Sequence, residues 1–478
     1  MTHQLPGPAK RRRLTNTNPE FEPNADAFRQ MQLRTVIREN HLSPISNVAF
    51  NNTIISGAMN CNNLVASIGS NQLNIYDNVH CNKNFLDLFM NYVHKIPKEN
   101  LDQVQEGEER HLPGATLSCL TWVYKPDPEN TNLAVGTQAG DIIILSLASS
   151  SATCVLKGHT GEITHVVPVQ VNSATNEQGL LSSSRDGLIK LWNTTTGRCI
   201  STYNAVDGGL ASGCESICIV IESDTTFLTS QPDGSIRRWT LNDQNFNQPM
   251  DIDTAVSSSS SSSTSSSSSS STSSTSKTKK NTKKSTNSAK QHNLDESTFV
   301  LSAPKPRPLS HFCASENGSL ITGTNNGRVS VWEKTNEDAT TDATSEYKCI
   351  TTFSVSRGDP ETLLKKKKSS ASTSAASPRY GSGSRNYSVA TSNEFVVTGN
   401  EGGEVIVFNG RTGSQISKLT HSRMNARSGN IENVDVSLDG TTILVSTSSG
   451  LLFRWSSLAV WEGEKGEKEK LVPAKLIA

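Results

Sequence analysis

Residues 158–167 read GHTGEITHVV and residues 180–193 read LLSSSRDGLIKLWN, and a related segment, LTSQPDGSIRRWT, occupies 228–240. The last two segments place a hydroxyl residue, an Asp-Gly turn and a tryptophan at the same spacing, and Trp192 and Trp239 lie 47 residues apart. A motif that returns every 40 to 50 residues or so indicates stacked copies of one small sheet, because such a sheet cannot bury its own faces alone. The repeat therefore predicts an all-β fold.

The position of these tryptophans can be followed along the whole chain. Each repeat ends its third strand with an aromatic or apolar anchor: Tyr76, Leu145, Trp192, Trp239, Trp332, Phe408 and Trp455. Three of the gaps between anchors equal 47 residues, and the three larger gaps contain polar segments that cannot form a core strand. Seven anchors predict a seven-bladed β-propeller over 29–462. If an N-terminal strand near 33–38 completes the last blade, the ring closes without an exposed sheet edge.

Four of the remaining segments have compositions that favour disorder: an N-terminal arm at 1–28 and insertions at about 95–113, 243–297 and 356–386. Residues 463–478 are a C-terminal tail. The second insertion contains a Ser/Thr tract at 256–276, and such polar repeats bury too little surface to offset chain entropy. We expect all of them to lie outside the propeller.

Composition restricts the environment of the protein. The formal net charge is zero. The nine cysteines lack zinc-ligand spacing, which favours reduced thiols and predicts no metal site. With neither a signal peptide nor an apolar run of 18 residues, we expect a soluble intracellular protein that contacts no membrane. The basic cluster Lys10-Arg11-Arg12-Arg13 predicts nuclear import.

Several polar residues have the spacing of the side-chain network of WD repeats. They are His159, Ser182 and Asp186 ahead of Trp192, with Thr229 and Asp233 ahead of Trp239 and Thr322 and Asn326 ahead of Trp332. A His–Asp–Ser set also invites a catalytic-triad interpretation, but buried polar groups must be paired, and in WD propellers this network pairs them. No nucleophile elbow, metalloprotease motif or phosphate-binding loop is present. We therefore expect no catalytic residues, no cofactor and no enzyme activity.

Longer stretches carry a more specific resemblance. They include ENHLSPISNVAFNN and LVASIGSNQLNIYD within 39–77, FMNYV at 89–93, TWVYKPDPENTNLAVGTQAGDIIIL at 121–145, VTGNEGGEVIVFN at 397–409, and the last blade from KLTHSRMN to FRW at 418–455. The order of these stretches and their amino-acid sequences resemble those of the Polycomb family that includes extra sex combs and embryonic ectoderm development (EED). The resemblance covers roughly 33–460 apart from the three insertions.

That resemblance implies a function. The family supplies non-catalytic scaffold subunits of Polycomb repressive complex 2, in which the propeller clasps an extended segment of the SET-domain methyltransferase, of the enhancer of zeste type. The complex methylates lysine 27 of histone H3 and supports transcriptional silencing. We therefore expect a nuclear chromatin protein that meets the nucleosome indirectly, through this methyltransferase and the other subunits.

Most family members also bind trimethyl-lysine in an aromatic cage at the opposite mouth of the ring. Alignment places the four cage positions at Ser46, Ser118, Tyr387 and Ser388, so that three of four are serine. One ring cannot enclose a quaternary ammonium, and methyl-lysine reading is expected to be weakened or lost. Phe50 and Trp122 lie nearby in the sequence, but both have the pattern of inward-facing core residues.

Two alternatives remain open from the sequence. The lysine-rich loops at 277–290 and 365–368 are either simply solvated or contact DNA phosphates without sequence preference. The propeller could instead be a substrate receptor of a ubiquitin ligase or another nuclear scaffold. Such receptors commonly carry an adaptor-binding helix beside the ring, and no amphipathic helix of adequate length precedes Leu33.

Overall fold

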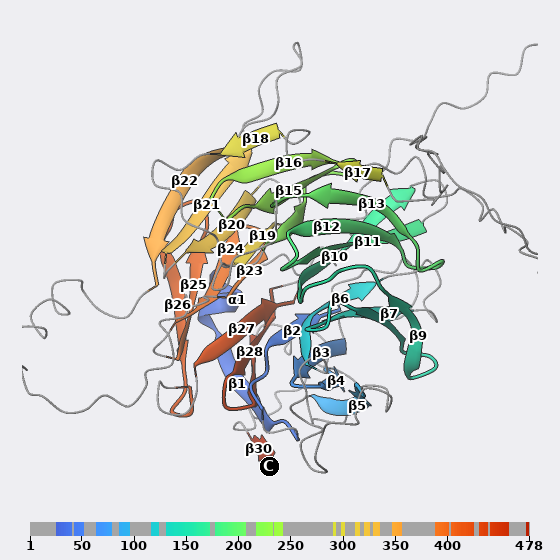
Figure 1. The fold of residues 1–478 in the computed structure, drawn as a ribbon. Coiled ribbons are helices and arrows are strands. Elements are labelled where there is room, and N and C mark those ends of the chain that lie inside the picture. Colours follow the sequence, from blue (N-terminus) through green and yellow to red (C-terminus); the bar gives the residue numbers. More distant parts are fainter. Residues whose placement is uncertain are drawn as a thin grey trace, which may run out of the picture.

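The computed structural model is a ring of seven small, largely antiparallel sheets, which confirms the predicted fold class (Figure 1). It describes residues 25–40, 43–51, 64–78, 86–95, 116–123, 131–172, 177–206, 217–232, 234–241, 290–292, 298–301, 311–315, 320–325, 328–334, 347–355, 388–400, 403–424, 430–437, 440–457 and 475–477. Each predicted anchor lies on the third strand of its own sheet, so the count of seven blades is correct.

The strands of the first four blades follow the chain, and each blade is given from its innermost strand outward. Blade one has β2 (Asn47–Phe50), β3 (Leu64–Gly69), β4 (Gln72–Asp77) and β5 (Asp87–Val93). Blade two has β6 (Leu117–Val123), β7 (Asn132–Thr137), β8 (Ile142–Ser146) and β9 (Ser151–Leu156). Blade three has β10 (Ile163–Asn172), β11 (Glu177–Ser184), β12 (Leu188–Asn193), β13 (Cys199–Asn204) and β17 (Lys290–His292). Blade four has β14 (Ile219–Ile221), β15 (Thr226–Ser230), β16 (Ile236–Thr240) and β18 (Thr298–Leu301).

The last three blades continue the same order. Blade five has β19 (His311–Ala314), β20 (Leu320–Asn325), β21 (Arg328–Lys334) and β22 (Tyr347–Ser354). Blade six has β23 (Val389–Ser392), β24 (Phe395–Gly399), β25 (Glu404–Asn409) and β26 (Gln415–Thr420). Blade seven has β27 (Ile431–Val436), β28 (Thr442–Thr447), β29 (Leu451–Ser457), β1 (Met31–Arg38) and β30 (Lys475–Ile477).

The ring is closed by its two ends. The first strand, β1, pairs antiparallel with β29 of the last blade, with Leu33 opposite Trp455. The innermost strands β2, β6, β10, β14, β19, β23 and β27 contact one another in turn, and β27 returns to β2. The predicted closing strand near 33–38 is therefore confirmed, and it begins slightly earlier, at Met31.

The hydrophobic core is divided among the joints between blades. Within the described residues, seven apolar clusters each combine residues of two adjacent blades. In one of them Ile142 and Leu156 of blade two pack with Ile163 and Trp192 of blade three. Because neighbouring sheets bury each other in this way, no blade is stable by itself.

Three expectations at the borders of the propeller need correction. The last residues of the expected disordered arm at 1–28 belong to a short helix, α1 (Ala25–Arg29), that buries Phe28. The expected insertion at 243–297 contains β17, which pairs parallel to β13. The expected tail at 463–478 contains β30, which pairs parallel to β1. The rest of these segments, and the insertions at 95–113 and 356–386 beyond Lys95, lie outside the described residues.

Candidate functional site

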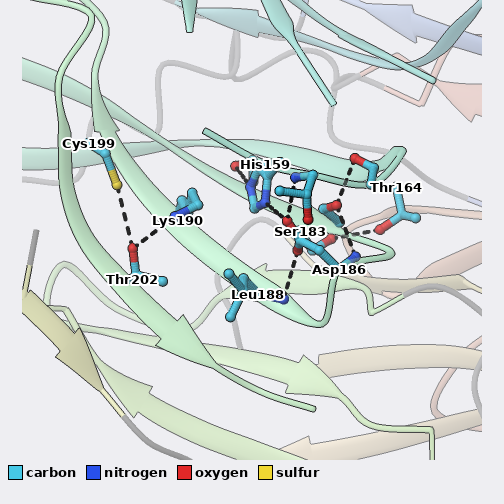
Figure 2. Close-up of polar contacts among 12 residues, drawn as sticks. His159, Thr164, Ser183, Asp186, Leu188, Lys190, Cys199 and Thr202 are labelled. Atoms are coloured by element: carbon cyan, nitrogen blue, oxygen red, sulfur yellow. Dashed lines mark hydrogen bonds and ion pairs between the residues drawn. The ribbon is translucent and has the colours of Figure 1, made fainter. Parts of the chain in front are cut away.

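The predicted polar network of blade three is present and buried. His159 Nε2 lies 2.8 Å from Ser182 Oγ, and the indole N–H of Trp192 donates to the same oxygen at 2.8 Å. His159 Nδ1 lies 2.9 Å from Asp186 Oδ2. Figure 2 shows this histidine directed toward Asp186, close to the turn before Leu188. Ser182 is fully buried, and its hydroxyl oxygen already accepts a hydrogen bond from the indole of Trp192. These side chains therefore hold strands together and do not present a nucleophile.

Asp186 also fixes the turn that precedes β12. Its carboxylate accepts the backbone N–H of Thr160 at 2.9 Å and of Leu188 at 3.0 Å. Gly187 follows with a φ of 82°, a conformation that glycine adopts without strain. Burial opposes ionisation of Asp186, but the hydrogen bond and charge of His159 and the two N–H groups hold its pKa below the usual value. The Asp-Gly pair of the sequence thus sets both the turn and the network.

Among the described residues, the network is repeated in part in the next two blades. In blade four the indole N–H of Trp239 donates to Thr229 Oγ1 at 2.9 Å, as the spacing predicts. In blade five Thr322 is buried, but its hydroxyl has no hydrogen-bond partner among the described residues. The other predicted members, Asp233 and Asn326, lie outside the described residues.

Blade one contains a variant of the network that the sequence did not indicate. The buried carboxylate of Glu39 accepts hydrogen bonds from the Ser67 hydroxyl, from Asn74 Nδ2 at 3.1 Å and from the Tyr76 hydroxyl at 3.0 Å. Ser67 and Tyr76 occupy the places of Ser182 and Trp192, so a glutamate replaces the histidine. Burial first, and then the charge of Glu39, raise the pKa of Tyr76. The only sequence signal was an acidic residue directly after a strand.

The serines predicted at the cage positions lie at the starts of innermost strands. Ser46 precedes β2, Ser118 is the second residue of β6, and Ser388 precedes β23. Since the innermost strands of a closed ring of like blades run in the same direction, their starts gather at one mouth. Tyr387, the aromatic member of the set, lies outside the described residues.

Two of these serines connect neighbouring blades. The Ser118 hydroxyl donates to the carbonyl of Ile163 in blade three at 2.6 Å. Ser388 is buried, and its Oγ accepts the N–H of Val434 in blade seven at 3.0 Å. Ser46 is exposed, and its hydroxyl donates to Ile68 O at 3.3 Å. The hydroxyls of Ser118 and Ser388 therefore satisfy backbone groups of the innermost strand of the next blade, a role that their spacing did not reveal.

The two aromatic residues beside the cage positions are core residues, as predicted. Phe50 is 3% exposed and packs in the joint between blades seven and one. Trp122 is buried between blades one and two, and its indole N–H donates to Ala49 O at 3.1 Å. Neither ring is free to form a wall of a cage.

The innermost strands of three blades carry titratable side chains with shifted pKa values. Burial lowers the pKa of His165 and of His311 to about 4, and the charge of His311 in blade five adds to the shift of His165 in blade three. Burial also raises the pKa of Cys313 to about 12, and the charge of Asp435 in blade seven adds to this shift. Among the described residues, no group of three or more His, Cys, Asp or Glu residues is arranged to hold a metal ion.

Asp435 makes the stability of the ring depend on pH. Its carboxylate accepts the N–H of Phe50 at 2.7 Å and of Val436 at 2.9 Å, yet burial raises its pKa to about 7. Because the pKa of Asp435 in the folded state lies above its unfolded-state value, this residue contributes stability at low pH that is lost as pH rises through 7. When pH falls from 8 to 6, we expect the free energy of unfolding of the wild type to rise by about 1 kcal/mol relative to that of Asp435→Asn. Urea unfolding of both proteins at the two pH values measures this. His165, His311 and Glu432 (burial also raises the pKa of this glutamate) are present in both proteins, and Cys313 with its pKa of about 12 stays neutral in the folded state at both pH values. A difference that does not change with pH would contradict it.

Comparison with known proteins gives partial similarities. No family model matches the chain. Over 224 residues it is 26% identical to Polycomb protein esc of Drosophila virilis, which covers 47% of this chain and 46% of that protein. Over 113 residues it is 26% identical to autophagy-related protein 16 of Arabidopsis thaliana, which covers 24% of this chain and 20% of that protein. The chain thus spans a half or less of the length of the curated relatives it matches.

No helix among the described residues has the length and apolar character needed to cross a membrane. Seven sheets of four or five strands, ring closure by β1 and a buried network of His, Ser, Trp and Asp are the features of a propeller built from WD repeats. The chain is a WD-repeat β-propeller.

Proposed function

We propose that this propeller is the non-catalytic scaffold subunit of a Polycomb-type complex that methylates lysine 27 of histone H3. The observation that supports this most is the similarity to Polycomb protein esc over nearly half of both chains. The network of blade three agrees with it, because its serine is buried and bonded to an indole rather than open to a substrate. A rigid ring of this kind serves as a platform for extended segments of other proteins.

The proposed partners follow from the family resemblance. The propeller holds a SET-domain methyltransferase of the enhancer of zeste type and, with the other subunits, meets the nucleosome indirectly in the nucleus. The basic cluster at 10–13 supports nuclear import. The lysine-rich loops at 277–290 and 365–368 are proposed to add non-specific DNA contacts; apart from Lys290 in β17 they lie outside the described residues.

Affinity purification of the full chain from nuclei tests the scaffold proposal against its alternative. A SET-domain protein is expected to co-purify in stoichiometric amount and to remain bound when DNA is digested. Recovery of cullin adaptors without a SET-domain protein would instead identify a substrate receptor of a ubiquitin ligase and overturn the proposal.

We further propose that the methyl-lysine reader of the family is blunted in this chain. The contacts of Ser118 and Ser388 support this, because their hydroxyls are committed to backbone groups of adjacent blades. Each cation–π contact contributes about 0.5–2 kcal/mol, so the loss of three ring faces costs on the order of 2–5 kcal/mol. That corresponds to an affinity about thirty-fold to several-thousand-fold weaker.

A peptide titration measures this loss. A histone H3 peptide trimethylated at lysine 27 is expected to show no saturable binding to the full chain at micromolar concentration, and the unmethylated peptide serves as its control. Saturable binding that requires the methyl groups and disappears in Tyr387→Ala would show that a working cage is present and that the four positions were assigned wrongly.

A further inference from the structure

A carboxylate lies among hydroxyl residues at the mouth where the innermost strands begin. Glu432 is the second residue of β27 and lies on a bulge, because the pairing of β27 with β28 passes from Ile431 directly to Asn433. The pairings of β6 and β10 skip Ser118 and Thr164 in the same way. A bulge redirects the side chain of the extra residue, so these three side chains occupy equivalent places in their blades.

These residues belong to one continuous arc of the ring. The innermost strand β27 contacts β2, β2 contacts β6 and β6 contacts β10, so blades seven, one, two and three follow one another around the mouth (Figure 1). Ser46, directly before β2, occupies the place between Glu432 and Ser118. Ser46 is exposed and the other three residues are half-buried, so solvent reaches all four.

Two of the hydroxyls in this arc donate their hydrogen atoms to the backbone. Ser118 donates to the carbonyl of Ile163 at 2.6 Å, and Ser46 donates to the carbonyl of Ile68 at 3.3 Å. A hydroxyl has one hydrogen to donate and two lone pairs with which to accept. The oxygen atoms of Ser46 and Ser118 therefore remain as acceptors for a ligand.

The third hydroxyl, that of Thr164, has the same polarity. Its oxygen lies 3.0 Å from Ser183 Oγ, and Ser183 donates its own hydrogen to the carbonyl of Ile217 at 2.6 Å. Ser183 has no second hydrogen, so Thr164 is the donor of that pair. The arc from blade one to blade three consequently presents acceptor oxygens.

Glu432 adds a carboxylate that the protein does not neutralise. It forms no hydrogen bond or ion pair with the described residues, and burial raises its pKa without an opposing effect of a nearby cation. An ionised carboxylate is also an acceptor only. Glu162, which directly precedes β10 at the same mouth, differs because Arg185 already pairs with it at 2.8 Å.

We propose that this arc binds the ammonium group of an unmethylated lysine presented by a partner protein. A protonated lysine has three N–H donors and no acceptor, which matches a carboxylate flanked by acceptor hydroxyls. A trimethylated lysine has no N–H and depends on aromatic faces instead. The inference goes beyond the scaffold role and holds whether or not the chain serves a methyltransferase.

Ligand-observed NMR titration of the full chain tests the chemistry with two probes, Nα-acetyl-lysine N-methylamide and its Nζ-trimethyl derivative. We expect saturable binding of the first probe at millimolar concentration. The second should bind about tenfold more weakly or worse, because it lacks the N–H donors. Equal affinity for the two probes, or no saturable binding of the first, would overturn the proposal.

Two matched variants test the location of the site. Glu432→Gln keeps the shape of the side chain and removes its charge, so the dissociation constant of the lysine probe should rise about tenfold. Glu162→Gln removes a carboxylate from the same mouth that is already paired with Arg185, and should change the dissociation constant far less. Unaltered binding to Glu432→Gln, or an equal loss in both variants, would refute the assignment to Glu432.

Discussion

Glu222→Gln is expected to lower the free energy of unfolding by about 3–5 kcal/mol, because it removes one partner of a buried ion pair. The Glu222 side chain is 2% exposed and accepts two hydrogen bonds from Arg238, at 2.5 Å and 2.7 Å. From blade five, Lys334 Nζ lies 3.3 Å away and the Tyr347 hydroxyl donates at 3.2 Å. The carboxylate thus joins blades four and five, and a neutral amide would leave the guanidinium of Arg238 buried without its counter-charge.

The surface offers a matched control for this substitution. Glu162 pairs with Arg185 at 2.8 Å, but the two side chains are 32% and 43% exposed. Exposed pairs contribute about 0–1 kcal/mol, so Glu162→Gln should change stability by no more than that. Urea unfolding of both variants at neutral pH gives the comparison. Equal costs for the two substitutions would show that Glu222 does not stabilise the joint.

The pH dependence of this effect follows from the pKa of Glu222. Burial opposes its ionisation, but the hydrogen bonds and charge of Arg238, with a smaller effect of Lys334, hold its pKa below the ordinary glutamate value. A lowered folded-state pKa gives stability that is present above the unfolded value and is lost as pH falls through the folded value. The difference in free energy of unfolding between wild type and Glu222→Gln should therefore become smaller below about pH 4.

Phe28→Ala is expected to cost about 3–5 kcal/mol, the range measured for truncating a large buried aromatic side chain. Phe28 is fully buried, and its ring centroid lies 4.8 Å from that of Phe395 in blade six. The same cluster includes Trp455 of blade seven and Met31 of the closing strand. The helix α1 therefore anchors ring closure, and the cavity left by alanine would open at that joint.

Thermal and urea unfolding measure the effect of Phe28→Ala. Val155→Ala is a suitable control, because Val155 is 44% exposed and surface truncations usually change stability by about 0.5 kcal/mol or less. A cost for Phe28→Ala as small as that of the control would mean that α1 is detached from the ring in solution.

Blade three shows why much of the fold could be predicted. Its Asp-Gly turn, hydroxyl and tryptophan are local in sequence, so the spacing of Ser182, Asp186 and Trp192 already fixes the strand, the turn and the network. The other anchors follow from the same period even where the tryptophan is replaced by Tyr76, Leu145 or Phe408. The pattern of buried residues within one blade can therefore be predicted from the sequence repeat alone.

Features that depend on distant segments were missed. The strands β17 and β30 are three residues long and exist only because β13 and β1 offer an edge, so no local pattern announces them. Phe28 lies in polar text, and its burial requires a pocket made by blades six and seven. Glu39 replaces a histidine in blade one, and a search for the usual residue types passes over it. The inter-blade hydrogen bonds of Ser118 and Ser388 likewise join residues about 45 positions apart.

We have proposed that this propeller supports methylation of lysine 27 on histone H3. Quantifying that mark by mass spectrometry in cells that lack the chain, and again after the wild-type chain is restored, tests it most directly. We predict near-complete loss of di- and trimethyl-lysine 27, recovery with the wild-type chain, and unchanged methylation at other histone lysines. Unaltered lysine 27 methylation in the absence of the chain would show that the propeller has no such role.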